Sequence, residues 1–490
     1  MLHVAGRFPA GGRSAMAAGG DGPRRHLAGR PDRRVAGRKG RLMLQTLTPL
    51  NAACRNRIPT RARPLVRWRR EAFGYLAAFP DGHVGIFGDD AVPLLQAGAD
   101  YDACISHLIP QLEVPTDFHF RAPLMAWLEL TRACNLRCPH CFVEGGVARA
   151  GELSTERILG LLDEWAAMGV FSVILTGGEP TMHPDFVVIL HHAHRLGFTV
   201  GIATNGMPIT ERLLAKIPRD DVIISVSIDH LHGQGGRSGA TDFDYVTRKL
   251  LLMQEAGFNT SIMTTTSSQN IDQLQAIIDW AVANDISLRS VPFVAMGRGS
   301  LNRHLVNDVD DVERAARFWI AEEEWERVRD PKIGLCAGKV FNFLLTMVYA
   351  TRRCMSGRGL CYVNSNGDVY PCSTCSGNKV LCAGNARWDS FAEIWDGHWD
   401  IRSITWDSFA DTCNGCAISE RRYFCTGRCP GSSSVLRGRL DGCGTTDFQK
   451  ASILRREELF KARIHAEPAV PVTRHQTKAP RSNATITAEA

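Results

Sequence analysis

The fold and the function of this chain are inferred first from the stretch Cys134-Asn-Leu-Arg-Cys138-Pro-His-Cys141. Its three cysteines have the spacing CxxxCxxC, and they directly follow an apolar segment, residues 126–131. Iron–sulfur clusters are held by cysteine thiolates, normally four of them. A cubic cluster that is held by only three protein thiolates would keep one iron open, and an open iron can bind a small molecule.

A zinc site is the alternative for the same cysteines. Structural zinc is bound by cysteine and histidine, often from CxxC pairs, and His140 could supply the fourth ligand. The cysteines could also be buried simply as small apolar residues. The residues that follow favour iron and sulfide over both alternatives.

A second motif follows a predicted strand. Residues 170–175 form a continuous apolar run of strand type, which leads into Thr176-Gly-Gly-Glu-Pro180. Paired glycines at the carboxyl end of a strand let backbone amides approach a ligand closely. The side chain of Glu179 could bind an ammonium group at that position.

With CxxxCxxC and GGEP in this order, each after a strand, the sequence resembles the radical S-adenosylmethionine superfamily. The resemblance implies that Cys134, Cys138 and Cys141 hold a [4Fe–4S] cluster. It also implies that S-adenosylmethionine chelates the open iron through its amino and carboxylate groups, with Glu179 on the amine. The residues of the second motif that would contact this cofactor are Gly177, Gly178, Glu179 and Pro180.

Between residues 121 and 330, apolar strands alternate with helical stretches, which predicts an α/β fold with its site at the carboxyl ends of parallel strands. The family resemblance narrows this fold to a six-stranded (βα)6 partial TIM barrel, open on one side. The strands are predicted near 126–131, 170–175, 198–204, 222–228, 259–265 and 286–294. The helices are predicted near 154–168, 184–196, 210–217, 242–256, 270–284 and 309–328.

Polar side chains at these strand ends are further candidates for cofactor contacts. Asn205 closes the third predicted strand, and Ser227 and Asp229 end the fourth. Family analogy places Ser227 or Asp229 near the ribose and methionine parts of the cofactor, whereas a turn or a helix cap is the alternative role. After the sixth strand, Arg298 stands in a Gly-Arg-Gly sequence and could bind a carboxylate.

Residues 331–465 form a cysteine-rich tail. Of the 16 cysteines in the chain, ten lie between Cys354 and Cys443 inclusive. A disulfide framework would need an oxidising compartment, for which the sequence carries no export signal. We therefore expect a cytoplasmic protein in which these cysteines bind metal.

The order of the tail cysteines resembles the SPASM domain found in many peptide-modifying radical enzymes. Its pattern is a cysteine, the hairpin Gly367-Asp-Val-Tyr-Pro-Cys372, a CxxC pair, a CxxxC pair and a final cysteine. The resemblance implies two auxiliary [4Fe–4S] clusters. One would be held by Cys413, Cys416, Cys425 and Cys443, and the other, nearer the barrel, by Cys354, Cys361, Cys372 and Cys429.

Two features of the tail leave its ligand sets open. Cys375 and Cys382 are additional to the family's pattern, so either could replace Cys361 as a ligand. One auxiliary site could also be incomplete, with an open iron that binds substrate. The spacing between Cys416 and Cys425 is also longer than the family's. A zinc ribbon is the alternative, with the CxxC pairs Cys372/Cys375 and Cys413/Cys416 as its ligands.

Residues 43–120 are predicted to form a small α+β unit. Residues 73–79, Pro80-Asp-Gly-His83 and 84–87 have the pattern of strand, turn and strand, followed by short helices near 90–97 and 101–112 with Asp89 or Asp90 and Asp100 as caps. The unit loosely resembles the peptide-recognition domain of ribosomal-peptide maturases, where a leader peptide adds as a strand to a free edge. A purely structural extension is the alternative.

The ends of the chain are expected to be disordered leader and tail, residues 1–42 and 466–490. The leader carries ten Lys and Arg against two Asp, so the net charge of +6 becomes −2 for the remainder, and no broad nucleic-acid-binding surface is expected. One interpretation of the leader is an organelle-targeting peptide. We prefer the interpretation in which the protein starts at Met43. No segment approaches the roughly 18 apolar residues that a membrane span needs.

The implied chemistry is reductive cleavage of S-adenosylmethionine to a 5′-deoxyadenosyl radical, which takes a hydrogen atom from a substrate. The favoured substrate is a ribosomally made precursor peptide that receives a thioether, a carbon–carbon link or another oxidation, with flavodoxin or ferredoxin as electron donor. One alternative is a sulfatase-maturing enzyme, although that family has Asp where Ser373 stands. Others are a small-molecule oxidoreductase, as in haem or amino-sugar biosynthesis, and a non-enzymatic electron carrier.

Overall fold

The computed structural model describes most of the chain between residues 66 and 466. The described residues are 66–80, 83–109, 114–115, 117–230, 243–320, 340, 343–344, 347–348, 351–413, 416 and 429–466. The predictions for residues 1–42 and 467–490, the Asp81-Gly82 turn and Cys425 therefore lie outside the described residues. So does the end of the helix predicted near 309–328.

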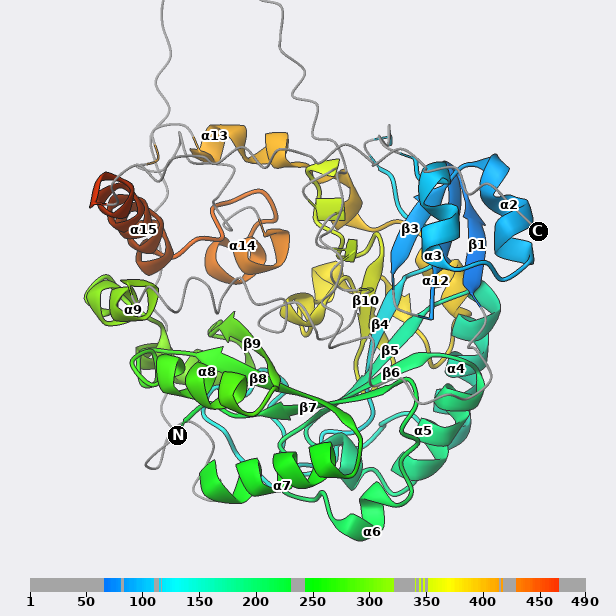
Figure 1. Cartoon of the computed structure of the whole chain (residues 1–490), viewed down its shortest axis with the longest axis horizontal. Coiled ribbons are helices and arrows are strands. Elements are labelled where there is room, and N and C mark those ends of the chain that lie inside the picture. Colours follow the sequence, from blue (N-terminus) through cyan, green and yellow to red (C-terminus); the bar gives the residue numbers. More distant parts are fainter. Residues whose placement is uncertain are drawn as a thin grey trace, which may run out of the picture. The chain divides into compact units, whose positions relative to one another are not determined.

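A nine-stranded sheet runs through the described part of the chain in the order β12-β11-β10-β4-β5-β6-β7-β8-β9 (Figure 1). The strands β4 to β9 are parallel and lie side by side in sequence order. They confirm the parallel α/β sheet that the sequence predicted. Their bounds are β4 (Met125–Glu129), β5 (Ser172–Thr176), β6 (Thr199–Thr204), β7 (Val222–Ser227), β8 (Asn259–Thr266) and β9 (Ser287–Pro292).

A helix follows each of these six strands, as the alternating pattern predicted. Ser154 caps the first of them, because its side chain accepts a hydrogen bond from the backbone N–H of Arg157 at 3.3 Å, and Gly169 ends it with φ +81°. The helices are α4 (Thr155–Met168), α5 (Phe186–Arg195), α6 (Glu211–Leu214), α7 (Phe243–Glu255), α8 (Leu274–Ala283) and α9 (Asp311–Ile320).

The two faces of the sheet have different roles. Successive side chains of a strand point to opposite faces. Ala126 and Leu128 therefore pack with Leu161 and Trp165 of α4 in the largest hydrophobic core, on the face that α4, α5 and α7 cover (Figure 1). Trp127, between them, points to the other face, which we call the inner face. The inner face is left for the site and for the tail.

The tail extends this sheet, which the sequence did not predict. The strand β10 (Leu360–Val363) pairs parallel with β4, and β11 (Asp368–Tyr370) and β12 (Gly384–Asn385) continue the sheet antiparallel. Tyr362 of β10 also donates a hydrogen bond to the buried carboxylate of Glu129 in β4 at 2.5 Å. The parallel strands β4 to β9 and the tail strands thus form one continuous sheet. The hairpin at Gly367, where φ is +95°, is confirmed.

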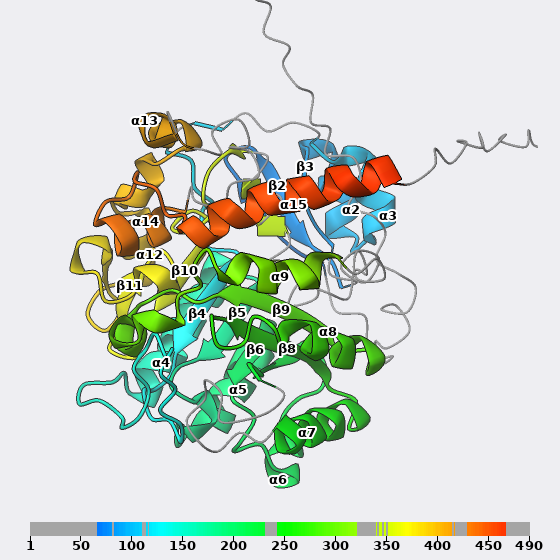
Figure 2. The same cartoon turned by 90° about the vertical axis from the view of Figure 1, so that its left-hand side faces the viewer.

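Further tail helices follow the sheet. They are α12 (Phe391–Asp396), α13 (Ala410–Cys413), α14 (Pro430–Arg437) and α15 (Asp447–Ala466). Figure 2 shows α15 lying along α9, and Arg455 of α15 forms an ion pair with Glu313 of α9 at 2.8 Å. Within the described residues, no helix is both long enough and apolar enough to cross a membrane.

The N-terminal unit contains a three-stranded antiparallel sheet of β1 (Arg67–Glu71), β2 (Gly74–Ala78) and β3 (Val84–Phe87). The predicted pair of strands is confirmed, whereas β1 was missed because its sequence Arg-Trp-Arg-Arg-Glu lacks apolar alternation. Two short helices follow, α2 (Val92–Gln96) and α3 (Tyr101–Cys104), and Asp100 caps α3 as predicted. Asp90 instead binds His107 at 2.7 Å.

Strand β1 contacts the amino ends of the parallel strands through Arg69. The Arg69 guanidinium donates hydrogen bonds to the carbonyl oxygens of Ala122 and Gly169, both at 2.6 Å. Gly169 lies shortly before β5, and Ala122 lies shortly before β4. The N-terminal unit therefore contacts the end of the sheet that is opposite to the carboxyl strand ends, where the predicted site residues lie.

Candidate active site

The loop after β4 holds the three cysteines of the first motif. Two of their sulfurs accept backbone hydrogen bonds, Cys134 from the N–H of Leu136 and Cys141 from the N–H of Gly145, both at 3.4 Å. Cys138 is buried, with 7% of its surface exposed. Backbone N–H groups that point at thiolate sulfurs are among the groups that tune iron–sulfur clusters. The donor set and its surroundings fit such a cluster.

The segment after β9 supports the cysteine loop through hydrogen bonds. The Arg298 guanidinium donates to the carbonyl oxygens of Cys138 at 3.0 Å and of Gly145 at 2.6 Å. The preceding residue, Gly297, has φ +52°, and a Cβ there would lie 2.2 Å from the carbonyl oxygen of Phe142. In this structure Arg298 thus supports the cysteine loop, and its predicted contact with a cofactor carboxylate stays a prediction.

The second motif packs directly on the first. The N–H of Gly178 donates to the carbonyl of Thr131 at 2.8 Å, and the N–H of Glu179 donates to that of Ala133 at 2.8 Å. A Cβ on Gly177 would lie 2.3 Å from the carbonyl oxygen of Thr131. The sequence predicted that the glycines approach a ligand, and the structure shows that they approach the backbone that precedes the cysteines.

Hydrogen bonds of Glu179 join the second motif to the end of β6. Its carboxylate accepts hydrogen bonds from the hydroxyl of Thr204 at 2.8 Å, the N–H of Asn205 at 2.8 Å and the hydroxyl of Thr181 at 2.6 Å. Burial raises its pKa, and these hydrogen bonds oppose the rise. The side chain is 0% exposed, so its predicted contact with a ligand amine would need a rearrangement and stays a prediction.

Asn205, directly after β6, also contacts the cysteine loop. The Asn205 side chain donates to the Asn135 carboxamide oxygen at 2.8 Å and approaches the sulfur of Cys134 at 3.9 Å. Ser227 ends β7 and is half-buried, and Pro180, which is buried, begins a 3-10 turn after β5. Glu179, Asn205 and Arg298 thus bring the ends of three strands to a single loop.

Asp229 forms a contact that sequence reasoning missed. One carboxylate oxygen accepts a hydrogen bond from the N–H of Thr265 at 2.7 Å, and the other lies 3.3 Å from Nε2 of His140. Nothing in the local spacing of either residue signals this pair. It orients the His140 side chain toward the end of β7.

In the tail, four thiols gather at the amino end of α14: Cys354, Cys372, Cys375 and Cys429. The sulfurs of Cys372 and Cys375 are 3.6 Å apart, and a Cβ on Gly431 in α14 would lie 3.5 Å from the sulfur of Cys372. Burial and, to a smaller extent, the neighbouring thiols of Cys429 and Cys372 raise the pKa of Cys354 to about 12. Burial and the Cys372 thiol also raise the pKa of Cys429.

Cys361 lies apart from this group, so its predicted place in the ligand set stays a prediction. It lies opposite Ala126 in the pairing of β10 with β4, so both side chains face the helices that cover the sheet. The side chain is fully buried there, and burial alone raises its pKa, with no contribution from another thiol. Cys375, which the sequence left as an extra, is in the group instead.

A second group lies around the loop before α15. The N–H of Cys416 donates to the carbonyl of Cys413 at 3.2 Å. The pKa of Lys450 is raised by its hydrogen bond to Asp447 and also by the thiols of Cys443 and Cys416. Cys413, Cys416 and Cys443 therefore lie in one region, and none of them contributes to the pKa shifts of Cys354, Cys375 or Cys429. The zinc ribbon from Cys372/Cys375 and Cys413/Cys416 finds no support.

The chemistry of these donors fits clusters better than single ions. All thirteen cysteines in the described ranges are free thiols. Among the same residues, no three or more His, Cys, Asp or Glu side chains are placed to hold one metal ion. A zinc ion draws its four ligands to one point, whereas a cubic cluster spreads its thiolates over four irons. An all-thiol donor set is the kind that iron–sulfur clusters use.

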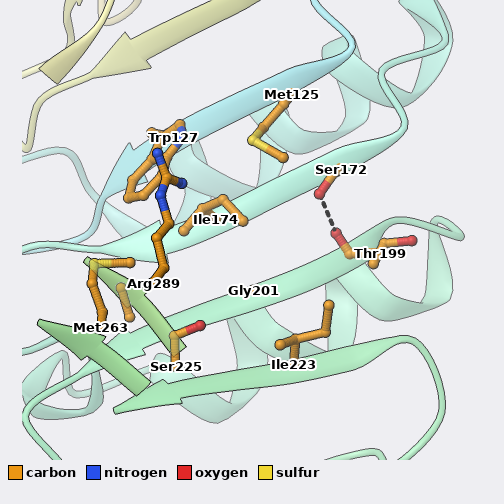
Figure 3. A pocket seen from close by; sticks show the side chains of 11 residues that line it. Met125, Trp127, Ser172, Ile174, Thr199, Gly201, Ile223, Ser225, Met263 and Arg289 are labelled. Atoms are coloured by element: carbon orange, nitrogen blue, oxygen red, sulfur yellow. Dashed lines mark hydrogen bonds between the residues drawn. The ribbon is translucent and has the colours of Figure 1, made fainter. Parts of the chain in front are cut away.

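A cavity lies on the inner face of β4 to β9 (Figure 3). It encloses about 480 Å³ of atom-free space, part of it open to solvent. Burial lowers the pKa of Arg289, which lines it, to about 10. The described lining residues are Met125, Trp127, Ser172, Ile174, Thr199, Gly201, Ala203, Ile223, Ser225, Met263 and Arg289.

Comparison with known proteins identifies the family of this chain. The family described as "Radical SAM superfamily" matches residues 128–281, and the SPASM family, described as "Iron-sulfur cluster-binding domain", matches residues 354–417. The mycofactocin maturase MftC of Mycolicibacterium smegmatis is 30% identical over 351 residues, which cover 69% of this chain and 85% of MftC. The chain therefore belongs to the radical SAM superfamily and carries a SPASM-type cluster-binding tail.

Other relatives are named for different activities. The AdoMet-dependent heme synthase of Methanosarcina barkeri is 30% identical over 330 residues, which cover 62% of this chain and 90% of the synthase. The PqqA peptide cyclase of Granulibacter bethesdensis is 27% identical, with 65% of this chain and 85% of the cyclase covered. As a member of this superfamily, the chain is an enzyme that uses S-adenosylmethionine and a [4Fe–4S] cluster.

Solved structures show the same fold. SuiB of Streptococcus suis, bound to its precursor peptide SuiA, matches with a TM-score of 0.57 at 15% identity, over 78% of this chain and 98% of SuiB. The protein anSMEcpe with bound AdoMet matches with a TM-score of 0.52 at 18% identity, over 70% of this chain and 98% of that protein. At these identities the likeness concerns the fold alone.

Proposed function

We propose that this chain is a radical S-adenosylmethionine peptide maturase that abstracts a hydrogen atom from a ribosomally made precursor peptide. The observation that carries the proposal is the direct packing of the two motifs, where the N–H of Gly178 donates to the carbonyl of Thr131 beside the cysteine loop. Relatives named as a maturase of mycofactocin and a cyclase of the PqqA peptide support the substrate class.

In this proposal the cluster is held by Cys134, Cys138 and Cys141, and with bound S-adenosylmethionine it supplies one-electron cleavage to a 5′-deoxyadenosyl radical. Cofactor contacts are assigned to the backbone of Gly177, Gly178 and Pro180 and to the strand-end side chains. The latter are Glu179, Asn205, Ser227, Asp229 and Arg298.

The chain's own residues position the cysteine loop from three directions. Glu179 joins the loop after β5 to the end of β6, Asn205 holds the segment at Asn135, and Arg298 supports the loop from the segment after β9. These contacts come from elements far apart in the sequence. The loop is therefore preorganised before any ligand binds, which reduces the cost of ordering it.

The tail is proposed to hold two auxiliary clusters. Cys354, Cys372, Cys375 and Cys429 would bind the first, with Cys375 in the place that we predicted for Cys361. Cys413, Cys416 and Cys443 would bind the second, together with Cys425. Four thiolates on the first cluster leave no iron open there, so its proposed role is to accept electrons rather than to bind substrate.

In the N-terminal unit, the edge of β3 to which a leader peptide would add is partly occupied. Leu108 forms an antiparallel bridge with Phe87 of β3, and the N–H of Ile109 donates to the carbonyl of Ile86 at 2.9 Å. A leader peptide that added to β3 would have to displace residues 107–109. The peptide-recognition role stays a prediction.

A porphyrin side-chain oxidation is the second candidate function. The heme synthase relative matches at the same 30% identity as MftC. Sulfatase maturation ranks below both, because Ser373 stands in place of the Asp that this family carries.

The test uses the anaerobically reconstituted full chain, reduced with dithionite in the presence of S-adenosylmethionine. We expect release of 5′-deoxyadenosine, measured by liquid chromatography and mass spectrometry, and its stimulation by a short peptide encoded beside this gene. Stimulation by coproporphyrin instead would favour the second candidate. Absence of 5′-deoxyadenosine under all conditions would contradict both.

A further inference from the structure

A fully buried arginine lies in the turn that follows the first cysteine of the tail. Arg358 is 0% exposed, and its N–H donates to the carbonyl oxygen of Met355 at 3.0 Å. The turn leads from Cys354 into β10. Cys354 belongs to the thiols that gather at the amino end of α14, which we call the four-thiol group: Cys354, Cys372, Cys375 and Cys429. A buried cation is costly unless its surroundings compensate its charge.

The hydrogen bonds of Arg358 satisfy its N–H groups without neutralising its charge. The guanidinium donates to the carbonyl oxygens of Phe118 and Arg402, and to that of Ile404 at 3.3 Å. In the part of the chain that the structure describes, these side-chain hydrogen bonds all end on carbonyl oxygens and none ends on a carboxylate. Carbonyl groups are neutral dipoles, so a full positive charge remains in the protein interior.

A thiol supplies the strongest negative influence on this guanidinium. Burial and, to a smaller extent, the charge of Arg353 lower the pKa of Arg358 to about 10, so the group stays charged near neutral pH. Two acidic groups oppose this fall, first Cys354 and then the exposed Asp117. The cation of Arg358 therefore interacts more strongly with a ligand of the proposed cluster than with any carboxylate of the described residues.

The same turn also contacts the thiols through Ser356. Burial raises the pKa of Cys354, and hydrogen bonds from the hydroxyl and the N–H of Ser356 oppose this rise. The pKa of Cys372 is lowered mainly by its hydrogen bond with Cys375 and also by the hydroxyl of Ser356. The turn between Cys354 and β10 thus brings both a hydroxyl donor and a buried cation to one side of the four-thiol group.

Charge of this kind affects how readily a cluster takes up an electron. One-electron reduction adds a negative charge to a cluster that four thiolates already make negative. Its reduction potential depends on net charge, on hydrogen bonds to the sulfurs and on solvent exposure. Burial opposes the added charge because water does not solvate it, whereas a fixed cation nearby stabilises it.

We propose that Arg358 raises the reduction potential of the auxiliary cluster on the four-thiol group by holding a buried positive charge beside it. The inference rests on the proposed function, because it concerns the cluster to which electron acceptance is assigned there. Arg358 acts through its charge alone and is neither oxidised nor deprotonated. It is therefore a residue that sets the properties of an electron acceptor, and it does not touch the substrate.

Arg402 offers a matched control for the loss of a buried arginine. It is also buried, and it donates to the carbonyl oxygens of Gly357 and Trp395, both at 2.7 Å. Burial and the charge of Arg358 lower its pKa to about 10, and the charges that oppose this fall are carboxylates rather than thiols. The two arginines thus share burial and carbonyl partners and differ in whether a thiol is near.

The experiment measures midpoint potentials of the anaerobically reconstituted full chain. The protein is titrated with dithionite in the presence of redox mediators, and reduced clusters are followed by electron paramagnetic resonance. The signal that is lost or altered in Cys375→Ala identifies the cluster of the four-thiol group. We expect its midpoint in Arg358→Met to fall by at least about 59 mV, which is tenfold in the equilibrium constant of a one-electron couple. Arg402→Met should shift it by about half as much at most.

Arg358→Lys separates the charge from the hydrogen bonds, because lysine keeps the charge and lacks the planar fork. Titrated also at mildly acidic pH, where a buried lysine stays protonated, this variant should keep the wild-type potential even with lower stability. A fall of about 59 mV or more in Arg358→Lys would overturn the proposal, and this variant decides alone if Arg358→Met does not fold. Unchanged potential in Arg358→Met, or equal shifts in Arg358→Met and Arg402→Met, would also overturn it.

A separate readout keeps this inference distinct from the proposed function. Release of 5′-deoxyadenosine by the wild type, measured without peptide, depends on the three-cysteine loop after β4 and not on the potential of the auxiliary cluster. Its absence would contradict the proposed function, whereas the titrations would still decide the role of Arg358.

Discussion

The cysteine loop after β4 and the first cysteine group of the tail use the same side chain in different surroundings. The loop has three thiols. The Asn205 side chain after β6 donates to the sulfur of Cys134, and Arg298 after β9 donates to the carbonyl oxygen of Cys138. The tail group has four thiols, gathered between the hairpin that ends at Cys372 and the amino end of α14. Three ligands leave one iron available and four do not, so ligand number separates proposed catalysis from proposed electron transfer.

The largest expected effect is on the three-thiol loop. Cys138→Ala should abolish release of 5′-deoxyadenosine and lower the iron content by about four atoms per chain, because two thiolates cannot retain a cubic cluster. Iron analysis and product quantification check this. Cys104→Ala is the control, since Cys104 is buried in the N-terminal unit, far from the other thiols in the described structure, and should keep both values.

The next effect concerns the four-thiol group and compares two buried cysteines. Cys375→Ala should lose or alter one auxiliary cluster, which would lower the iron content or change the electron paramagnetic resonance of the reduced protein. Cys361→Ala should keep its iron and its spectrum and lose only about 1 kcal/mol of packing stability. If instead Cys361→Ala loses iron while Cys375→Ala keeps it, the revised ligand set is wrong.

A smaller effect is expected where the two motifs pack together. Gly177→Ala would place a methyl group 2.3 Å from the carbonyl oxygen of Thr131, so it should destabilise the fold by about 3 kcal/mol and impair cluster retention. Gly257→Ala is the matched control, because Gly257 also has positive φ but no heavy atom lies within 4 Å of its added Cβ. That substitution should cost only about 1 kcal/mol. Thermal denaturation compares the two, and equal losses would refute close packing as the reason for Gly177.

The smallest effect concerns Glu179 and pH. Because burial raises its pKa, the folded protein holds the proton to a higher pH than the unfolded chain does. The stability from this group is therefore full below its ordinary pKa and falls as pH rises through the raised value, by about 1.4 kcal/mol per pH unit within that window.

Glu179→Gln cannot lose a proton, so the stability difference between this variant and the wild type should shift in favour of the variant as pH rises. Melting temperatures of the two proteins across mildly acidic to neutral pH measure this shift. A constant difference across that range would argue that the carboxyl group keeps one charge state throughout.

Much of the architecture could be predicted because its signals are local. The strands β4 to β7 are short, largely apolar runs, and Ser154 caps the start of α4, so both can be predicted from neighbouring residues. The spacing of Cys134, Cys138 and Cys141 is likewise local. By contrast, β1 was missed because its charged side chains are satisfied by distant carbonyls such as that of Gly169.

The sequence by itself determined the alternation of strands and helices, the two motifs and the presence of a cysteine-rich tail, because spacing and periodicity act over a few residues. Only the tertiary structure decided which thiols gather, since the pairing of Cys361 with Ala126 turns that side chain toward the helices and leaves Cys375 beside Cys372. It also decided that Glu179 is buried and that Arg289 enters a cavity. These outcomes depend on residues brought together across long sequence separations, where no local pattern carries the information.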